Sequence, residues 1–337
     1  MRFSFFATLA CLAFGKAAAF KGIDDGWSFD LDEANHADWM DIIPDSRLLS
    51  DIVIPGTHNS VTDKLTSSLM QTQNVPLEQQ LIGGIRYIDI TCKVTKNGLM
   101  VYHGLDDTGY SFGNVLGTIF AFLDQHQRET VILRIQMGGV FKSSEAFAES
   151  LEQTLTSSSY LNVEAADRLY SRADGDISSI PTLGTLRGKV FILENFKTST
   201  PGRYGLPWNK NTVSNYGLTF SASTTSMDSK WDDIKSHLSG NPWNFLNKLR
   251  ITHTTASVGV CPINFAARTA PKVGMNTHLG KYLADKLGDC FGIIAMDFPG
   301  KHLVDQILQC NEEYEAASFS AADRAGPLTS TGAPVNA

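Results

Sequence analysis

Short apolar runs alternate along the chain with stretches of helical periodicity. The runs are rich in β-branched residues and are bounded by Gly, Pro, Asn or Asp, which is typical of strands. We expect strands at Asp51–Ile54, Ile85–Val94, Leu99–Gly104, Thr130–Met137, Lys189–Asn195, Leu218–Ser223, Leu249–Thr255 and Gly292–Phe298. Helical patterns fall at Leu77–Ile82, Val115–Gln127, Ser144–Thr156 and Ala284–Leu287. About eight β/α repeats predict an α/β fold, namely an irregular (β/α)8 TIM-type barrel in a single domain.

Two segments do not suit a regular barrel. The link between Ile85–Val94 and Leu99–Gly104 is short, whereas a crossover between parallel strands needs about a dozen residues. We therefore expect the regular geometry to fail there. The segment from Lys197 to Gly217 is rich in Pro, Gly, Asn and aromatic residues, and we predict a long loop on the mouth side of the barrel.

The first residues are predicted to be a targeting segment. Met1-Arg2 gives a positive start, Phe3 to Phe14 is nearly all apolar, and Ala17-Ala18-Ala19 offers a small-residue cleavage site. We expect residues 1–19 to be a signal peptide and the mature protein to be secreted. The barrel is expected over residues 38–315. Residues 316–337, rich in Ala, Ser, Thr, Gly and Pro, are predicted to be a disordered tail.

Composition narrows the classes of partner. Of the 337 residues, 42% are hydrophobic and 19% are charged, which is ordinary for a globular protein. The formal net charge of −7 argues against a general nucleic-acid binder and gives no broad cationic surface for anionic membranes. We therefore expect no nucleic-acid partner.

Two histidines lie at predicted strand ends. His58 follows Pro55-Gly56 at the end of the run Asp51–Ile54, and His103 ends Val101-Tyr102-His103. A single histidine at such a place is more often structural or merely exposed. Two of them at the mouths of two strands suit an acid/base pair, because imidazole titrates near neutral pH.

Strand alternation directs several polar side chains into the barrel mouth. Apolar positions of each strand face the helices, so the intervening polar positions point inward near the strand ends. These inward polar residues are Asp89, Thr91, Lys93, Arg134, Gln136 and Asp297. Barrel interiors are normally filled with branched apolar residues, so this set is the clearest functional signal in the sequence.

Five motifs in chain order resemble those of the phosphatidylinositol-specific phospholipase C catalytic (X) domain, closest to its single-domain secreted bacterial form. They are Ile43-Pro44-Asp45-Ser46, IPGTHNS at 54–60, the segment 84–90, VYHG at 101–104 and Met296-Asp297-Phe298. The similarity runs from Trp39 to about Cys310. It implies a TIM-type barrel that cleaves the glycerol-side phosphodiester of an inositol phospholipid by attack of the inositol 2-hydroxyl.

The resemblance also implies roles. His58 would be the general base on the attacking hydroxyl, His103 the general acid on the leaving oxygen, and Asp297 the carboxylate that orients one histidine and raises its pKa. The remaining histidines fall outside the pattern and are predicted to be surface or structural residues. They are His36, His126, His237, His253, His278 and His302.

The chain departs from the family at the phosphate. Thr91 stands where the bacterial form has an Arg, Gln136 where it has a Lys, and an inositol-binding Arg maps near Asn195. Asn59 replaces a bacterial Asp and matches the calcium-dependent eukaryotic enzymes. Asn59 and Asp89 together offer only one carboxylate, however, so we expect no tightly bound catalytic calcium and no cofactor.

Something must still offset the phosphate charge in the transition state. Lys93 is our first candidate and Arg134 our second, while Arg86 lies on the opposite alternation and suits a structural ion pair. With Asn59, Asp89 and Gln136 these two complete the predicted substrate and phosphate site.

Two other functions remain open at this point. A catalytically degenerate barrel would bind lipid or a surface partner without turnover, as the loss of family residues at Thr91, Gln136 and Asn195 suggests. A metal-dependent glycerophosphodiesterase-like enzyme would need a carboxylate cluster that the sequence does not supply. The partners expected for the enzyme are an inositol phospholipid or related phosphodiester and, through peripheral contact, a membrane.

Four cysteines remain after removal of the signal, and an even number in a secreted chain suggests disulfides. Cys290 precedes the last strand and Cys310 ends the helix after it, so both should lie at the bottom of the barrel. Cys92 and Cys261 should both lie at the mouth. We predict the pairs Cys290–Cys310 and Cys92–Cys261.

Overall fold

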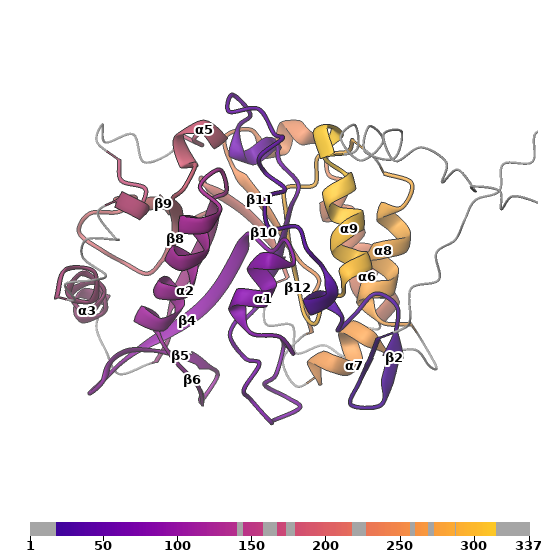
Figure 1. Ribbon diagram of the computed structural model, residues 1–337, viewed down its shortest axis with the longest axis horizontal. Coiled ribbons are helices and arrows are strands. Elements are labelled where there is room, and N and C mark those ends of the chain that lie inside the picture. Colours follow the sequence, from indigo (N-terminus) through magenta and orange to yellow (C-terminus); the bar gives the residue numbers. More distant parts are fainter. Residues whose placement is uncertain are drawn as a thin grey trace, which may run out of the picture.

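The structure is a computed structural model that describes residues 18–139, 144–157, 167–172, 179–217, 227–256, 260–268, 273–286 and 288–314. A curled parallel sheet surrounded by helices forms its centre (Figure 1). Its parallel strands are β3 (Ile54–Thr57), β4 (Tyr87–Thr95), β7 (Val131–Met137), β8 (Val190–Asn195), β9 (Gly205–Pro207), β10 (Val213–Tyr216), β11 (Leu249–His253) and β12 (Ile293–Met296). They lie in the order β10-β11-β12-β3-β4-β7-β8-β9, which is the chain order of a (β/α)8 barrel left open between β9 and β10. The predicted irregular TIM-type barrel is confirmed.

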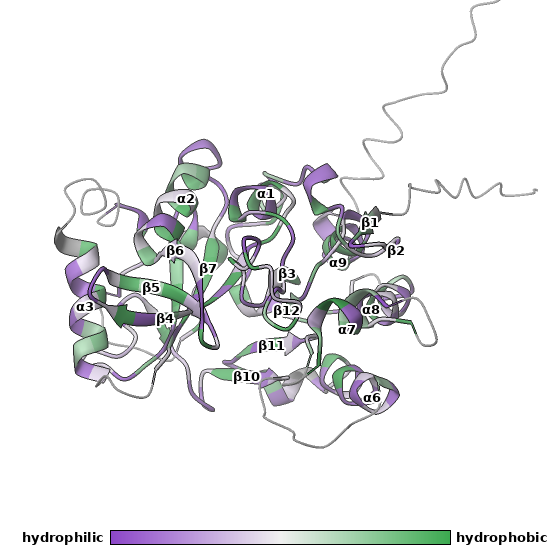
Figure 2. Ribbon diagram, turned by 90° about the horizontal axis from the view of Figure 1, so that it is seen from below, coloured by the Kyte–Doolittle hydropathy of each residue, from purple (hydrophilic) through white to green (hydrophobic). Residues whose placement is uncertain are grey.

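Helices cover the outside of the ring. Figure 2, seen from the side of the strand ends, has α1 and α2 on one flank and α6 to α9 on the other. The helices are α1 (Leu77–Ile82), α2 (Phe112–Gln125), α3 (Ser144–Ser157), α5 (Leu183–Leu186), α6 (Met227–Leu238), α7 (Pro262–Ala267), α8 (Met275–Leu283) and α9 (Lys301–Gln309). In α2, Val115, Leu116 and Ile119 are buried at helical spacing, and Ser111 and Asn114 form a capping box at its start.

An antiparallel hairpin breaks the barrel pattern where the sequence predicts an irregularity. Strands β5 (Gly98–His103) and β6 (Asp106–Ser111) extend the sheet from β4. β4 pairs with β7 along Tyr87–Cys92, so β5 lies on the opposite edge, beyond the point where β3 ends. The hairpin thereby returns His103 to the barrel mouth.

Several predicted boundaries are wrong. Pro55 and Gly56 do not end a strand but lie inside β3, where Gly56 packs so closely on Tyr87 that a Cβ would clash with it. The expected long loop at 197–217 contains the short strands β9 and β10. Helix α8 ends at Leu283, directly before the helix expected at Ala284–Leu287. The strand expected at Leu218–Ser223 lies outside the described residues, and β10 occupies its place in the ring.

The packed unit begins earlier than residue 38. Strands β1 (Ala18–Phe20) and β2 (Ile23–Asp25) form a small hairpin, and Phe29 and Leu31 are buried against the barrel. Of the predicted signal peptide only its last two residues are described, and the predicted tail lies outside the described residues.

All four described cysteines are free thiols, so neither predicted disulfide is formed. Cys92 is buried within β4, whereas Cys261 caps α7 on the other side of the ring and donates to Ser68 O. The thiols of Cys290 and Cys310 each donate to a backbone carbonyl. Three of the four thiols therefore donate to backbone carbonyls instead of forming the expected pairs.

A buried ion pair joins β4 to the start of β7. Arg86 and Glu129 are both fully buried, with 2.7 Å between Arg86 Nε and Glu129 Oε2. The guanidinium also donates to Leu81 O and Ala37 O, and Glu129 Oε1 accepts from Met40 N. The pair therefore fastens the N-terminal lead to the barrel, and the prediction that Arg86 is structural is confirmed.

Replacing Glu129 by Gln should destabilise the fold by about 3 kcal/mol, because it leaves the Arg86 charge buried without a counter-ion. Urea unfolding of the two proteins measures the difference. Arg128→Ala is the matched control: Arg128 is half-exposed and pairs with Asp41 at the surface, so its loss should cost less than about 1 kcal/mol. Equal effects of the two substitutions would contradict the account.

Candidate active site

His58 lies where the neighbouring strands β3 and β12 end. It directly follows β3, and its backbone N–H donates to Met296 O at the end of β12. Thr57 and Met296 are paired in the sheet, so the residue after each strand is a neighbour of the other. His58 Nδ1 consequently lies 2.9 Å from Oδ1 of Asp297, whose side chain is almost fully buried.

Buried amides and hydroxyls hold the turn that carries His58. Gln73 Nε2 donates to the carbonyls of both His58 and Met296, and Thr72 Oγ1 also donates to His58 O. Asn59 has a φ of 42°, a left-handed conformation that asparagine tolerates better than most residues. Its Nδ2 lies 2.8 Å from His58 Nε2. With Nδ1–H donated to Asp297, Nε2 is the nitrogen left to accept a proton.

His103, at the end of β5, faces His58 across the mouth. The two ring centroids are 6.1 Å apart and the rings are nearly perpendicular. His103 Nδ1 lies 2.6 Å from Met70 O, so this nitrogen donates and Nε2 remains available to a ligand. The hairpin and the β3 turn thus bring the two predicted histidines together.

A second ion pair forms the floor of the site. Arg134 Nη1 donates to both carboxylate oxygens of Asp89, at 2.8 and 3.0 Å, and Nη2 donates to Gln136 Oε1. The guanidinium also lies over the Trp208 ring. Burial alone would raise the pKa of Asp89, but the charge of Arg134, together with His253 and His58, holds that pKa well below its usual range. The charge of Arg134 is therefore already matched by Asp89.

Sequence reasoning missed a third histidine. His253 ends β11, is fully buried, and lies with its ring centroid 5.9 Å from that of His58. Its Nε2 is 3.6 Å from Asp89 Oδ2, and burial lowers its pKa. The signal was weak, because His253 lies inside the predicted strand Leu249–Thr255, on the same alternation as the apolar Leu249 and Ile251.

Lys93 lies on the rim rather than the floor. Its Nζ donates to Gly104 O at 2.7 Å and lies over the Tyr102 ring, next to His103 on the same hairpin. Gly138 packs beside the Lys93 side chain, where a Cβ would crowd it. Lys93 therefore places its ammonium group at Gly104, the residue that follows His103.

Three of the four departures from the bacterial form lie side by side. Thr91 of β4 pairs with Gln136 of β7, which pairs with Asn195 of β8. They form one row directly above Asp89 and Arg134, and all three are uncharged. The predicted site residues are thus brought together, but this row carries no positive charge.

The two mouth histidines have opposite pKa shifts. Burial alone would lower the pKa of His58, but the charge and hydrogen bond of Asp297, with Asp89 behind it, raise it above the ordinary value. Burial lowers the pKa of His103, and the charge of His58 lowers it further. Such a pair binds its protons in two separate steps, as acid/base catalysis requires.

The described residues offer little to a metal ion. Within them, no group of three or more His, Cys, Asp or Glu side chains is arranged to hold one. Asp89 is the one carboxylate that Asn59 and Asp89 together offer, and Arg134 donates to both of its oxygens.

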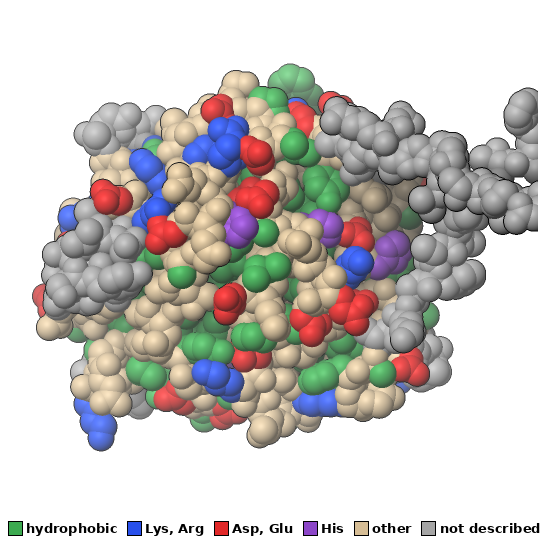
Figure 3. All heavy atoms as spheres, in the orientation of Figure 1, with side chains coloured by type: hydrophobic (Ala, Val, Ile, Leu, Met, Phe, Trp, Pro, Cys, Tyr) green, Lys and Arg blue, Asp and Glu red, His purple; other side chains and the backbone are tan. Residues whose placement is uncertain are grey.

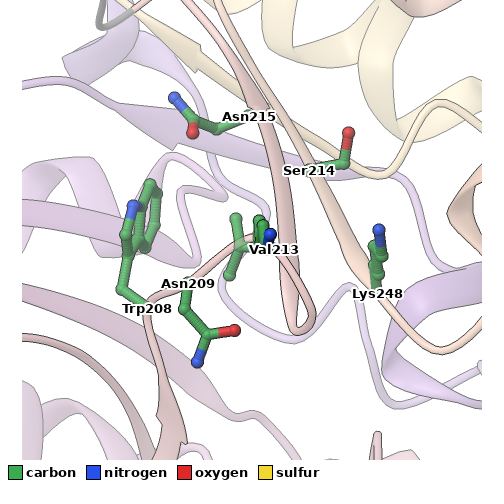
Figure 4. Close-up of a pocket in the computed structure, with 7 residues that line it drawn as sticks. Trp208, Asn209, Val213, Ser214, Asn215 and Lys248 are labelled. Atoms are coloured by element: carbon green, nitrogen blue, oxygen red, sulfur yellow. The ribbon is translucent and has the colours of Figure 1, made fainter.

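A separate pocket of about 400 Å³ lies at the open seam of the barrel (Figure 4). Trp208 and Asn209 line it on one side, and Val213, Asn215 and Lys248 on the other. Neither mouth histidine lines it, so it offers no acid/base pair. It touches the floor of the site only through Trp208, which stacks on Arg134.

Comparisons with known proteins agree with this geometry. The family model "Phosphatidylinositol-specific phospholipase C, X domain" matches residues 48–196. A 1-phosphatidylinositol phosphodiesterase of Listeria monocytogenes is 30% identical over 287 residues, covering 81% of this chain and 84% of the relative. The chain belongs to the phosphatidylinositol-specific phospholipase C family. A 1-phosphatidylinositol phosphodiesterase of Staphylococcus aureus is 23% identical over 159 residues, covering 46% of this chain and 49% of the relative.

Solved structures of phosphatidylinositol-specific phospholipases C share the fold. The Listeria monocytogenes enzyme superposes with a TM-score of 0.68 at 27% identity, covering 82% of this chain and 99% of that one. A variant of the Staphylococcus aureus enzyme gives a TM-score of 0.63 at 17% identity, covering 84% and 98%. The second likeness concerns the fold alone.

NMR titration of the histidine imidazoles tests the electrostatics of this phospholipase C site. We expect His58 to titrate above the ordinary value of about 6.5 and His103 below it. Asp297→Asn removes the carboxylate that raises the pKa of His58 while burial remains, so that pKa should fall. A His58 that titrates at the same pH in both proteins would refute the assignment. Asp305→Asn, which alters the partner of the distant His36, is the control and should leave His58 unchanged.

Proposed function

We propose that this protein is a secreted phospholipase C-type phosphoric diester hydrolase that cleaves phosphatidylinositol or a related glycerophosphodiester. The proposal rests on the arrangement of His58, Asp297 and His103 at the mouth of a barrel that belongs to the phosphatidylinositol-specific phospholipase C family. The apolar start of the chain after Met1-Arg2 supports secretion.

Acid/base chemistry follows from the Nε2 atoms of His58 and His103, whose Nδ1 atoms are held by Asp297 and by Met70 O. His58 Nε2 takes the proton of the inositol 2-hydroxyl while Asp297 holds Nδ1–H and stabilises the imidazolium that forms. The 2-hydroxyl oxygen then bonds to phosphorus. The bond from phosphorus to the glycerol oxygen breaks, and His103 gives that oxygen a proton. Diacylglycerol and a cyclic inositol phosphate result, with one proton moved between the histidines.

The reactive form has a neutral His58 and a protonated His103. The pKa shifts of the free protein favour the reverse placement of the single proton. The two forms carry the same net charge, so the pH–rate profile should be bell-shaped, with limbs that belong to the pair. A bound phosphodiester anion beside His103 favours its protonated form and so moves the proton toward the reactive arrangement.

Lys93 is the group we propose as the counter-charge for the phosphate. Asp89 neutralises Arg134, whereas Lys93 donates only to the carbonyl of Gly104 and lies beside the hairpin that carries His103. Asn59, whose amide lies at His58 Nε2, would contact the attacking hydroxyl or the phosphate. Gln136 and Asp89, which both accept hydrogen bonds from Arg134, complete the polar wall of the site. The reaction as proposed needs no calcium.

An apolar rim around the mouth supports docking at a lipid surface. Leu69 adjoins Met70, whose carbonyl binds His103, and Leu105 follows the same histidine by two residues. Val260 adjoins Cys261, whose thiol donates to Ser68 O. These three side chains are 52%, 88% and 43% exposed. No helix in the described part of the chain is long and apolar enough to cross a bilayer, and we propose peripheral contact through this rim.

Charge on the surface is mixed. On the face in Figure 3, acidic and basic side chains are interspersed rather than segregated. This agrees with the net charge of −7 and gives no support for a nucleic-acid partner.

Alanine substitution of either histidine tests the function. His58→Ala and His103→Ala should each lower kcat on phosphatidylinositol by about 10²–10⁴-fold, because each removes one proton-transfer partner. The assay measures release of the cyclic inositol phosphate, with and without EDTA. His126→Ala serves as the control, because His126 follows the end of α2, where it stacks on Phe122 and pairs with the exposed Asp38.

The outcomes separate the three candidate functions. Product formation that EDTA does not affect, and that both substitutions abolish, supports the proposal. Loss of product with EDTA identifies a metal-dependent phosphodiesterase. Binding to phosphatidylinositol vesicles with no product identifies the degenerate barrel.

Leu105→Asp tests the docking rim. Removal of one leucine from an apolar contact costs about 1.5 kcal/mol or more, so binding to phosphatidylinositol-containing vesicles should weaken about tenfold. Hydrolysis of a water-soluble inositol phosphodiester should stay unchanged. Trp243→Asp is the control: Trp243 is 75% exposed but precedes β11, at the end opposite the mouth. Equal loss of vesicle binding in both variants would exclude the rim.

A further inference from the structure

The N-terminal lead makes direct contact with the turn that carries Asp297. Residues 25–30, here called the N-terminal strap, run antiparallel to residues 297–300 after β12, with a bridge between Ser28 and Pro299. Phe29 N donates to Phe298 O, and Gly300 N donates to Trp27 O. The strap lies far from the histidines in sequence, yet it borders their orienting carboxylate.

Asn276 connects the strap to this turn. It is fully buried on the first turn of α8, and its Nδ2 lies 2.8 Å from Ser28 Oγ and 3.1 Å from the carbonyl oxygens of both Asp297 and Phe298. One amide group therefore contacts the backbone of Asp297 and the strap together. A buried polar group with several partners is costly to displace.

The strap end of the connection is also fixed. Ser28 Oγ donates to Asp25 Oδ2 at 2.5 Å, and Thr277 Oγ1 donates to the other oxygen of Asp25. Asp25, Ser28 and Asn276 are all buried. The chain Asp25–Ser28–Asn276 thus ties the strap, the start of α8 and the Asp297 backbone into one network.

Both sides of the contact adopt unusual backbone conformations. Phe29 and Phe298 have φ values of 79° and 48°, a region that bulky residues occupy only when surrounding contacts enforce it. Their rings pack on one another at 5.8 Å, and Phe20 covers both. The contacts of the strap, rather than the intrinsic backbone preferences of its residues, therefore hold the turn after β12 in this conformation.

We propose that Asn276 and Ser28 are positioning residues for catalysis, and that the N-terminal strap sets the orientation of the Asp297 carboxylate toward His58. Within the described part of the chain, that carboxylate also accepts a hydrogen bond from Ala256 N, at a long 3.4 Å. Its direction thus depends chiefly on the backbone of Asp297, which Asn276 holds. The inference deepens the proposed function and rests on it for its effect on rate.

Asn276→Asp in the full-length protein tests the proposal. The substitution keeps the shape but turns carboxylate oxygens toward two carbonyls, so the Asp297 turn should shift. We expect kcat on phosphatidylinositol to fall about tenfold or more while KM stays within about twofold, because small misplacements of catalytic groups act on the chemical step. The pKa of His58, followed by NMR, should fall because Asp297 supports it less. Ser28→Ala should also lower kcat and the pKa of His58, each by a smaller amount.

Asn311→Asp is the matched control. Asn311 is also buried and bonds the backbone of Val53 through both ends of its amide, but it lies at the bottom of the barrel before β3. It should lose comparable stability without changing the pKa of His58. If Asn276→Asp does not fold, Ser28→Ala decides the matter.

The outcomes also separate this proposal from the proposed function. Folded Asn276→Asp or Ser28→Ala protein with an unchanged His58 pKa overturns the positioning role, whatever the wild-type activity. If these substitutions lower the pKa of His58 but the wild-type protein has no activity on phosphatidylinositol, the positioning role of the strap is supported and the proposed function is overturned.

Discussion

The hydrogen bond between His58 and Asp297 is the interaction on which the rest of the site depends. It exists because β3 and β12 are parallel neighbours whose ends coincide. Every other feature of the mouth is arranged around it. Gln73 and Thr72 hold the histidine turn, Asn276 holds the aspartate turn, and the hairpin after β4 brings His103 to face the pair. The open seam between β9 and β10 lies elsewhere in the ring and leaves this arrangement intact.

Charge in the site is organised as two internally matched pairs. Asp89 with Arg134 forms the buried floor, and Asp297 with His58 forms the pair proposed to accept the proton. Above the floor, Thr91, Gln136 and Asn195 make an uncharged row where the bacterial form that the sequence resembles carries basic residues. A phosphate entering this mouth therefore meets two histidines and the rim lysine Lys93, not a cluster of fixed cations. Substrates with more phosphate groups gain nothing from such a row.

Much of the site follows from strand periodicity alone. Alternation places Asp89, Arg134 and Gln136 on inward faces, and the parallel barrel brings the residues after β3 and β12 together. The same rule applied to Leu249–Thr255 directs His253 outward with Ile251 and Arg250 inward. In the structure the two faces are reversed, because Arg250 donates to Leu238 O of α6 and His253 lies beside His58. Sequence could not show that Arg134 is matched by Asp89, because that depends on the register between β4 and β7.

Other features depend on tertiary contacts that no local pattern records. Pro55 and Gly56 form a strand because it pairs with β12 and β4 on its two sides, although both residues usually end one. The disulfide prediction failed because topology gives the end of the barrel at which a cysteine lies, but not the direction of its thiol. Asn276 and Ser28 gave no signal, because their partner is a backbone turn distant in sequence.

The central claim is that two imidazoles move one proton across a phosphodiester without a metal. Time-resolved ³¹P NMR of phosphatidylinositol vesicles with the protein in EDTA tests it most directly. The account predicts that the signal of a cyclic inositol phosphodiester appears first, at a rate that added calcium does not change. A phosphomonoester formed with no cyclic intermediate, or a reaction that starts only when calcium is added, would contradict it.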